Sequence, residues 1–234
     1  METKTRDASD FNPSIIQVIK HIFFKPKFSL NTKAIKEMIF DYEYANYKIL
    51  KPLLSDIKFD KEEITMFYPG CGFDSVFPLL YLDILLTKKN KKVDLILNDI
   101  NISHDLMCKA FQKVTGLNYA KKIGKARYYK KFRLLFKDKE IMLHTFESNV
   151  LEARPKILSK GIDIYFERGF KIIRESSENF LPFVLKHVRK KGLIIVDQRI
   201  DDPNLIKEFS LKEINKKIPK DFGFYKDLTI YRKE

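Results

Sequence analysis

Glycine, cysteine and tryptophan are scarce in this sequence. Its 234 residues include 8 glycines, 2 cysteines and no tryptophan, whereas glycine alone usually makes up about 7% of a protein. So few glycines exclude collagen-like chains and flexible glycine-rich linkers. The two cysteines, Cys71 and Cys108, are too few for a disulfide framework, and without a Cys-x-x-Cys pair they do not indicate a zinc site.

Long apolar runs are missing as well. The longest, over residues 76–86, is interrupted by Pro78 and Asp83, and it is too short to cross a bilayer. Residues 1–14 are polar and have no apolar stretch of the kind that signal peptides contain. We therefore expect a cytoplasmic protein that makes no membrane contact.

Apolar residues, in contrast, are plentiful enough for a sizeable core. Hydrophobic residues make up 44% of the chain, with 20 phenylalanines and 11 tyrosines. A mostly disordered chain would contain far fewer aromatic residues. The length suits one folded domain with an appendage.

Positive charge is in excess, because 45 Lys and Arg against 31 Asp and Glu give a formal net charge of +14. This charge favours a polyanionic partner, since basic side chains that contact phosphates release counterions; a composition bias that only maintains solubility explains it equally well. The densest basic stretch is interleaved with Tyr128, Tyr129 and Phe132, a pattern that suits either nucleic-acid binding or a solvated face. Its basic residues are Lys121, Lys122, Lys125, Arg127, Lys130, Lys131 and Arg133.

The N-terminal segment, residues 1–60, has the apolar spacing of helices. Residues 14–26 and 32–52 repeat apolar positions every three or four residues, and residues 53–57 continue as a short helical piece. Pro26 and Pro52 are expected to end or kink these helices.

From Ile64 onward, predicted strands alternate with predicted helices, and the alternation continues to residue 232. This alternation favours a mostly parallel central sheet with helices on both faces, so residues 61–234 are expected to form one doubly wound α/β domain. The basic run 189–191 with Gly192 is expected to end a helix, and residues 137–140 to form a hairpin turn. The predicted strands are 64–68, 93–97, 132–136, 141–146, 162–166, 193–196 and 222–232, and the predicted helices 74–86, 103–114, 180–188 and 204–216.

One glycine turn has the placement of a ligand site. Gly70 and Gly72 follow the first predicted strand directly and precede a helix. Glycine lets the backbone turn tightly and approach a ligand without an intervening Cβ, and ligands of open α/β sheets bind beyond the carboxyl ends of the strands. Asp99 ends the next strand, where a carboxylate can accept both hydroxyls of a ribose. A glycine turn that binds no ligand is the alternative.

Residues 60–234 resemble the class I S-adenosylmethionine-dependent methyltransferases. In that family an acidic residue, any residue and Gly-x-Gly-x-Gly follow the first strand, and the matching stretch here runs from Tyr68 to Asp74. Two glycines match, whereas Tyr68 replaces the acidic residue and Asp74 replaces the third glycine. The resemblance implies a Rossmann-like fold, S-adenosylmethionine as cofactor and methyl transfer to an unknown substrate.

The resemblance also implies roles for individual residues. Asp99 would bind the ribose, and Phe146 and Glu147, which close the third strand, would contact adenine. Glu167 follows the fourth strand, where the family often places a substrate-facing residue, and would take a proton from a substrate amine or hydroxyl. A structural carboxylate, either solvated or paired with Arg168, is the alternative for Glu167. The implied cofactor-binding residues are Tyr68, Gly70, Gly72, Asp74, Asp99, Ile100, Phe146 and Glu147.

Asp74 bears on the choice of cofactor. Its negative charge would repel a phosphate but would accept a hydrogen bond from an amino group, which favours S-adenosylmethionine over NAD or FAD. An N-cap for the following helix is an equal alternative. Because Tyr68 and Asp74 depart from the family's pattern, a catalytically inactive domain that binds a partner such as RNA is an alternative. An aminopropyl transferase that uses a decarboxylated form of the cofactor is a third possibility.

The remaining reactive side chains are expected to be structural. Cys71 lies within the glycine turn and is predicted to pack as a small apolar residue. The histidines have no metal-ligand spacing, and a strand position predicts an interior imidazole for His144. These histidines are His21, His104, His144 and His187.

Overall fold

The computed structural model describes residues 49–72, 77–102, 104, 107, 121–123, 128–136, 139–152, 154–214 and 228–234. The predicted helix 14–26, residues 32–48 of the next predicted helix and most of the predicted helix 103–114 lie outside these ranges. The residues named above that also lie outside them are His21, Pro26, Asp74, Cys108, Lys125 and Arg127. Residues 49–54 are helical. Leu50 and Leu54 of this helix belong to the core on the α4 side of the sheet, together with Ile57 and Phe59, whereas Ile49 is exposed.

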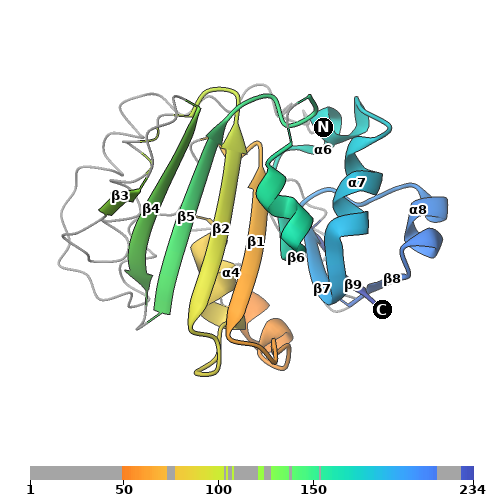
Figure 1. The fold of residues 1–234 in the computed structure, drawn as a ribbon. Coiled ribbons are helices and arrows are strands. Elements are labelled where there is room, and N and C mark those ends of the chain that lie inside the picture. The colour runs from red at the N-terminus through yellow and green to blue at the C-terminus, as the bar shows by residue number, and fades with distance from the viewer. Residues whose placement is uncertain are drawn as a thin grey trace, which may run out of the picture.

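A mixed sheet of nine strands forms the centre of the described structure (Figure 1). Its strands lie in the order β3-β4-β5-β2-β1-β6-β7-β9-β8. The five central strands, β5 to β7 in that order, are parallel, whereas the pairs at both edges are antiparallel. The strands are β1 (Glu63–Pro69), β2 (Lys92–Asp99), β3 (Lys121–Ile123), β4 (Tyr129–Phe136), β5 (Lys139–Glu147), β6 (Ile162–Glu167), β7 (Val188–Val196), β8 (Leu211–Glu213) and β9 (Thr229–Lys233).

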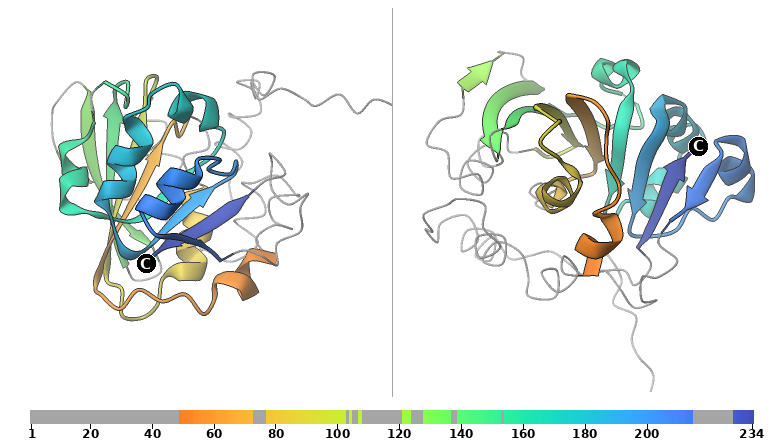
Figure 2. Two further views of the ribbon diagram at one scale, coloured as in Figure 1. Left: turned by 90° about the vertical axis from the view of Figure 1, so that its right-hand side faces the viewer. Right: turned by 90° about the horizontal axis from the view of Figure 1, so that it is seen from below.

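Helices pack on both faces of this sheet, because the buried strands alternate their apolar side chains between two cores. In β1, Met66 and Tyr68 face the core of α4, whereas Phe67 faces the core of α7, as the period of a strand requires. The left view of Figure 2 shows α4 and α7 on opposite sides of the strands. The helices are α4 (Pro78–Leu85), α6 (Lys171–Glu175), α7 (Phe180–His187), α8 (Pro203–Glu208) and the short 3₁₀ helix η2 (Lys156–Lys160).

The α/β class and the parallel centre of the sheet are confirmed. The doubly wound arrangement stays a prediction, because much of the connection between β2 and β4 lies outside the described ranges. The β4–β5 hairpin is confirmed, with Phe136 paired to Lys139 across the turn. Within the described part of the chain, no helix is long and apolar enough to cross a membrane.

The prediction that residues 189–192 end a helix is wrong. Helix α7 ends at His187, and β7 already begins at Val188, which pairs with Ile162 of β6. The register then shifts, and Lys191 takes the left-handed conformation at φ 64°. A side chain on Gly192 would bring its Cβ within 2.8 Å of the Arg189 carbonyl oxygen, so this glycine serves close backbone packing instead of a helix cap.

The predicted helix over residues 204–216 is also wrong over residues 209–214, and residues 215 and 216 lie outside the described ranges. Helix α8 ends at Glu208, and Ser210 has φ 51°. The chain then forms β8, in which Leu211 is buried and pairs with Lys233 of β9. Pairing with a strand distant in the sequence outweighs the local helical spacing here. Strand β9 begins at Thr229, within the broader predicted segment 222–232.

Candidate functional site

The sheet has a topological switch point between β1 and β6. From β1 the chain adds β2 and then β5 on one side, and later returns to add β6 and β7 on the other side. In open α/β sheets, ligands bind beyond the carboxyl ends of the strands at such a point. The residues that follow the two strands are 70–72 after β1 and 168–170 after β6. These carboxyl ends lie at the top of Figure 1.

The turn after β1 is bonded directly to the end of β2. Gly70 and Gly72 have φ of 59° and 44°, values that favour glycine. The Gly72 N–H donates to Asp99 Oδ2 at 2.9 Å, and the Asn101 N–H donates to Asp99 Oδ1 at 3.0 Å. A carboxylate offers about four acceptor positions, so each Asp99 oxygen retains capacity for a further donor. Asp99 itself is half-buried at the edge of the sheet.

The two glycines of this turn have different surroundings. A Cβ on Gly70 would overlap the ring of Phe170, whereas a Cβ on Gly72 would have no atom of the described residues within 4 Å. Phe170 is buried and follows β6, so Gly70 allows the turns after β1 and β6 to pack together. Gly72 instead borders open space beside Asp99, where a ligand can approach the backbone.

The end of β5 lies beside the end of β2. Asp99 pairs in register with Glu147, and the Ser148 N–H donates to the Asp99 carbonyl at 3.0 Å. Asn98 Nδ2 donates to the Phe146 carbonyl at 3.2 Å and to Ser148 Oγ at 2.9 Å. Asn98 Oδ1 is buried and has no hydrogen-bond partner among the described residues. The structure therefore brings both predicted acidic residues, Asp99 and Glu147, to one edge.

The other predicted cofactor residues have mixed surroundings. Phe146 is half-buried and stacks on Tyr129 at 4.5 Å between ring centroids, whereas Ile100 is 63% exposed next to Asp99. Tyr68 is buried in the core and packs edge-to-face on Phe166 at 4.8 Å. Tyr68 therefore lies beneath the glycine turn and not at its surface.

The end of β6 is closed by an ion pair. Glu167 is 0% exposed and accepts from the guanidinium of Arg174 and, at 2.6 Å, from the Tyr165 hydroxyl. Burial raises the pKa of the Glu167 carboxyl to about 6, although the positive charge of Arg174 opposes the shift. The predicted role of Glu167 as a base stays a prediction; its burial and bonding favour the structural alternative, with Arg174 as the partner instead of Arg168.

Asp197, at the end of β7, holds the same loop from the other side. Its two carboxyl oxygens accept from the Gly169 N–H at 3.1 and 3.0 Å. Burial and the nearby charge of Glu167 raise the pKa of Asp197 to about 8. Glu167 and Asp197 together fix residues 168–170, and through Phe170 they fix the glycine turn.

Several of these contacts left no signal in the sequence. No sequence motif surrounds Arg174. Its pairing with Glu167 depends on the turn that leads from β6 into α6. Asn98 and Phe170 act through contacts with distant segments. The one sequence feature that points to Asn98 as a site residue is its position directly before Asp99.

The interior positions predicted for His144 and Cys71 agree with the structure. His144 is buried and bonds to the Tyr129 hydroxyl at 2.8 Å and to Asp94 at 3.3 Å, which confirms the interior imidazole. Cys71 is buried in the apolar core. Within the described ranges, no three or more His, Cys, Asp or Glu side chains are arranged to hold a metal ion.

The predicted basic stretch lies on the antiparallel edge of the sheet. Lys130, Lys131 and Arg133 belong to β4, and β3 contributes Lys121 and Lys122. Arg133 forms an ion pair with Glu140 of the neighbouring strand, and Tyr128 is largely exposed. Nucleic-acid binding by this edge stays a prediction.

Comparison with known proteins gives a distant likeness in fold. No protein-family model matches the chain, and no curated protein matches it in sequence. The structural neighbours include class I S-adenosylmethionine-dependent methyltransferases. A protein from Listeria monocytogenes assigned to that class is 10% identical with a TM-score of 0.43, and the match covers 80% of this chain and 58% of the other.

Two other solved structures match at a similar level. The MycE methyltransferase of the mycinamycin pathway, in complex with Mg and SAH, is 13% identical with a TM-score of 0.40, covering 90% of this chain and 49% of that one. Phosphofructokinase from Pichia pastoris is 13% identical with a TM-score of 0.43, covering 87% and 82%. This chain thus spans less than two thirds of both methyltransferases, and a likeness at this level is no guide to activity.

Proposed function

We propose that this chain is an S-adenosylmethionine-dependent methyltransferase that binds its cofactor at the switch point between β1 and β6. The observation that carries the proposal is the Gly72 N–H bond to Asp99 Oδ2 at 2.9 Å, which joins the glycine turn to the acid expected to bind ribose. A carboxylate held this way keeps a fixed orientation toward two vicinal hydroxyls.

Two features of the described residues fit a nucleoside cofactor. The space that a Cβ on Gly72 would fill is open, so a ligand can lie against the backbone there. Asn98 Oδ1 is a buried acceptor without a partner in the described part of the chain, and buried acceptors are usually satisfied. The residues that would hold the cofactor are Gly70, Gly72, Asn98, Asp99, Ile100, Phe146 and Glu147.

Methyl transfer mainly requires that the acceptor atom, the methyl group and the sulfur lie in line. The bound cofactor would supply the methyl group and the sulfur. Glu167, Arg174 and Asp197 would contribute by fixing the loop of residues 168–170 that borders the site. We assign them a positioning role, and the methyl acceptor follows from no feature of the described residues.

Calorimetric titration with S-adenosylmethionine tests the proposal. We expect saturable binding that weakens at least about 100-fold in Asp99→Ala, because two hydrogen bonds to a charged group are lost. Asp56→Ala is the matched control, since it removes the same charge from an exposed position, and it should bind as the wild type does. Absence of binding at millimolar cofactor would refute the proposal.

A domain that binds without catalysis is the second candidate, favoured by Tyr68 at the position of the family's acidic residue. Tyr68 has no carboxylate to offer a ligand, and its side chain is buried against Phe166. Radiolabelled methyl transfer to a cell extract separates the two candidates. Cofactor binding without any labelled product would favour the inactive domain.

A further inference from the structure

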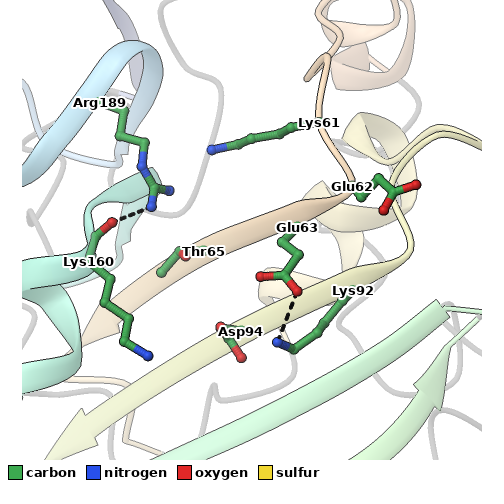
Figure 3. Close-up of a pocket in the computed structure, with 8 residues that line it drawn as sticks. All are labelled: Lys61, Glu62, Glu63, Thr65, Lys92, Asp94, Lys160 and Arg189. Atoms are coloured by element: carbon green, nitrogen blue, oxygen red, sulfur yellow. Dashed lines mark hydrogen bonds and ion pairs between the residues drawn. The ribbon is translucent and has the colours of Figure 1, made fainter.

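A cavity lies at the opposite end of the strands from the candidate cofactor site. It opens over the amino ends of β1 and β2 and has a volume of about 470 Å³, within the range of small-molecule sites. Unlike most such sites, it is lined almost entirely by charged side chains. Its lining residues, drawn in Figure 3, are Lys61, Glu62, Glu63, Thr65, Lys92, Asp94, Lys160 and Arg189.

One wall of this cavity is a preorganised cationic surface. The ammonium group of Lys61 and the guanidinium of Arg189 both bind Asp163, whose side chain is only 3% exposed. Arg189 Nη1 donates at 2.7 Å, and the Thr65 N–H donates to the same Asp163 oxygen at 2.8 Å. Lys61 and Arg189 point toward one another in Figure 3. Asp163 thus holds two cations in place while each stays partly open to the cavity.

The position of Arg189 also depends on a glycine. Gly161 has φ 94°, and a Cβ there would lie 2.6 Å from Arg189 Nε. Arg189 Nη2 donates to the carbonyl of Lys160, one residue earlier. A guanidinium has five N–H donors, and these contacts leave donors of Arg189 available to a ligand. The turn after η2 is therefore shaped to let the guanidinium lie across it.

The excess of positive charge in the cavity is confined to this wall and suits an anionic group. Lys61 and Arg189 together exceed the charge of Asp163 by one, and Lys160 adds one more cation, which has no ion pair among the described residues. The other charged residues of the lining balance this excess: Glu63 forms an ion pair with Lys92 at 3.3 Å, and Glu62 and Asp94 are acids. A phosphate monoester carries a charge of about −1.5 to −2 at pH 7. Asp94 lies on the opposite side of the cavity, where it accepts from His144 at 3.3 Å, and its remaining capacity suits hydroxyl donors.

We propose that this cavity binds a phosphate monoester of a small hydroxylated molecule. Lys61, Lys160 and Arg189 hold the phosphate group, and Asp94 accepts from the hydroxyl groups. This site is separate from the proposed methyltransferase site, so it does not depend on that function.

Calorimetric titration of the full chain with ribose 5-phosphate, inorganic phosphate and ribose tests this proposal. We expect binding of ribose 5-phosphate that weakens at least about tenfold in Lys160→Ala, because one charge-assisted hydrogen bond is lost. Lys156→Ala is the matched control, because Lys156 is an exposed lysine of the same 3₁₀ helix that does not line the cavity. Gly161→Ala should weaken binding by displacing Arg189.

Each alternative result has a definite meaning. Equal weakening in Lys160→Ala and Lys156→Ala would show general attraction to a basic protein and would overturn the site, as would no binding at 10 mM, a concentration about tenfold above a Kd of 1 mM. Equal affinity for inorganic phosphate and ribose 5-phosphate would overturn the role of Asp94. Retained binding in Asp99→Ala would support a site that is distinct from the cofactor crevice, and its loss would contradict that.

Discussion

The two halves of the carboxyl edge of the sheet use carboxylates in opposite ways. At the ends of β1 and β2, Asp99 is half-buried and bonds to two backbone N–H groups. At the ends of β6 and β7, Glu167 is fully buried against Arg174, and Asp197 is buried against Gly169. Each acid lies at the end of its strand, but Asp99 is only half-buried and lies beside Gly72, where a side chain would meet open space.

This difference separates ligand binding from scaffolding. A buried charged carboxylate is costly unless it is paired and hydrogen-bonded. Glu167 is accordingly paired with Arg174, whereas Asp197 keeps its proton up to a pH of about 8 and accepts from the Gly169 N–H; together they fix the loop between them. Asp99 is only half-buried, so its charge is less costly to keep, and each of its oxygens can accept a further hydrogen bond. A strand-end acid is thus no evidence of a ligand contact by itself, and its burial decides the role.

The largest effect is expected for Arg174→Met. It leaves Glu167 buried without its counterion, which should lower the free energy of unfolding by about 3–5 kcal/mol in urea denaturation. Lys171→Met is the control, because Lys171 pairs with the exposed acids Glu175 and Asp201 and should cost about 1 kcal/mol at most. An equal loss of unfolding free energy in the two variants would contradict a strongly stabilising buried Glu167–Arg174 pair.

The two glycines of the β1 turn give the next effect. Gly70→Ala should cost about 2–4 kcal/mol, because it adds overlap with Phe170 to the strain of a left-handed conformation. Gly72→Ala should cost only the strain, about 1–2 kcal/mol, while weakening cofactor binding. Thermal unfolding measures the stabilities, and equal losses would show that Phe170 does not restrict the turn.

A smaller effect is expected from the titration of Asp197. Its pKa is raised to about 8 in the folded protein, above the usual value near 3.9, so the folded state holds this proton more tightly. Stability should therefore fall as pH rises from about 4 to 8, and Asp197→Asn should flatten that fall. The gain of the variant over the wild type should grow with pH and level off above about 8. Parallel stability curves would contradict the raised pKa.

The sequence alone predicts those elements of the fold that depend on the local pattern of apolar residues and glycines. The buried runs 64–68, 93–97 and 162–166 are strands, and the glycine turn lies where strand and helix predictions place it. The misassigned segments, 189–192 and 209–214, are those in which pairing with distant strands decides the conformation. The Glu167–Arg174 pair was hidden for the same reason, because no local pattern shows which cation a buried acid will meet.

The division of the edge into a binding half and a scaffold half is tested most directly by S-adenosylmethionine affinity in two matched variants, Asp99→Asn and Asp197→Asn. Both replace an acid by its neutral isostere at a strand end, and Asp197 is largely protonated at pH 7 already. In calorimetry at pH 7, Asp99→Asn should weaken binding at least tenfold, the effect of about 1.4 kcal/mol, whereas Asp197→Asn should leave it within about twofold. Strong loss in Asp197→Asn with wild-type binding in Asp99→Asn would contradict the account.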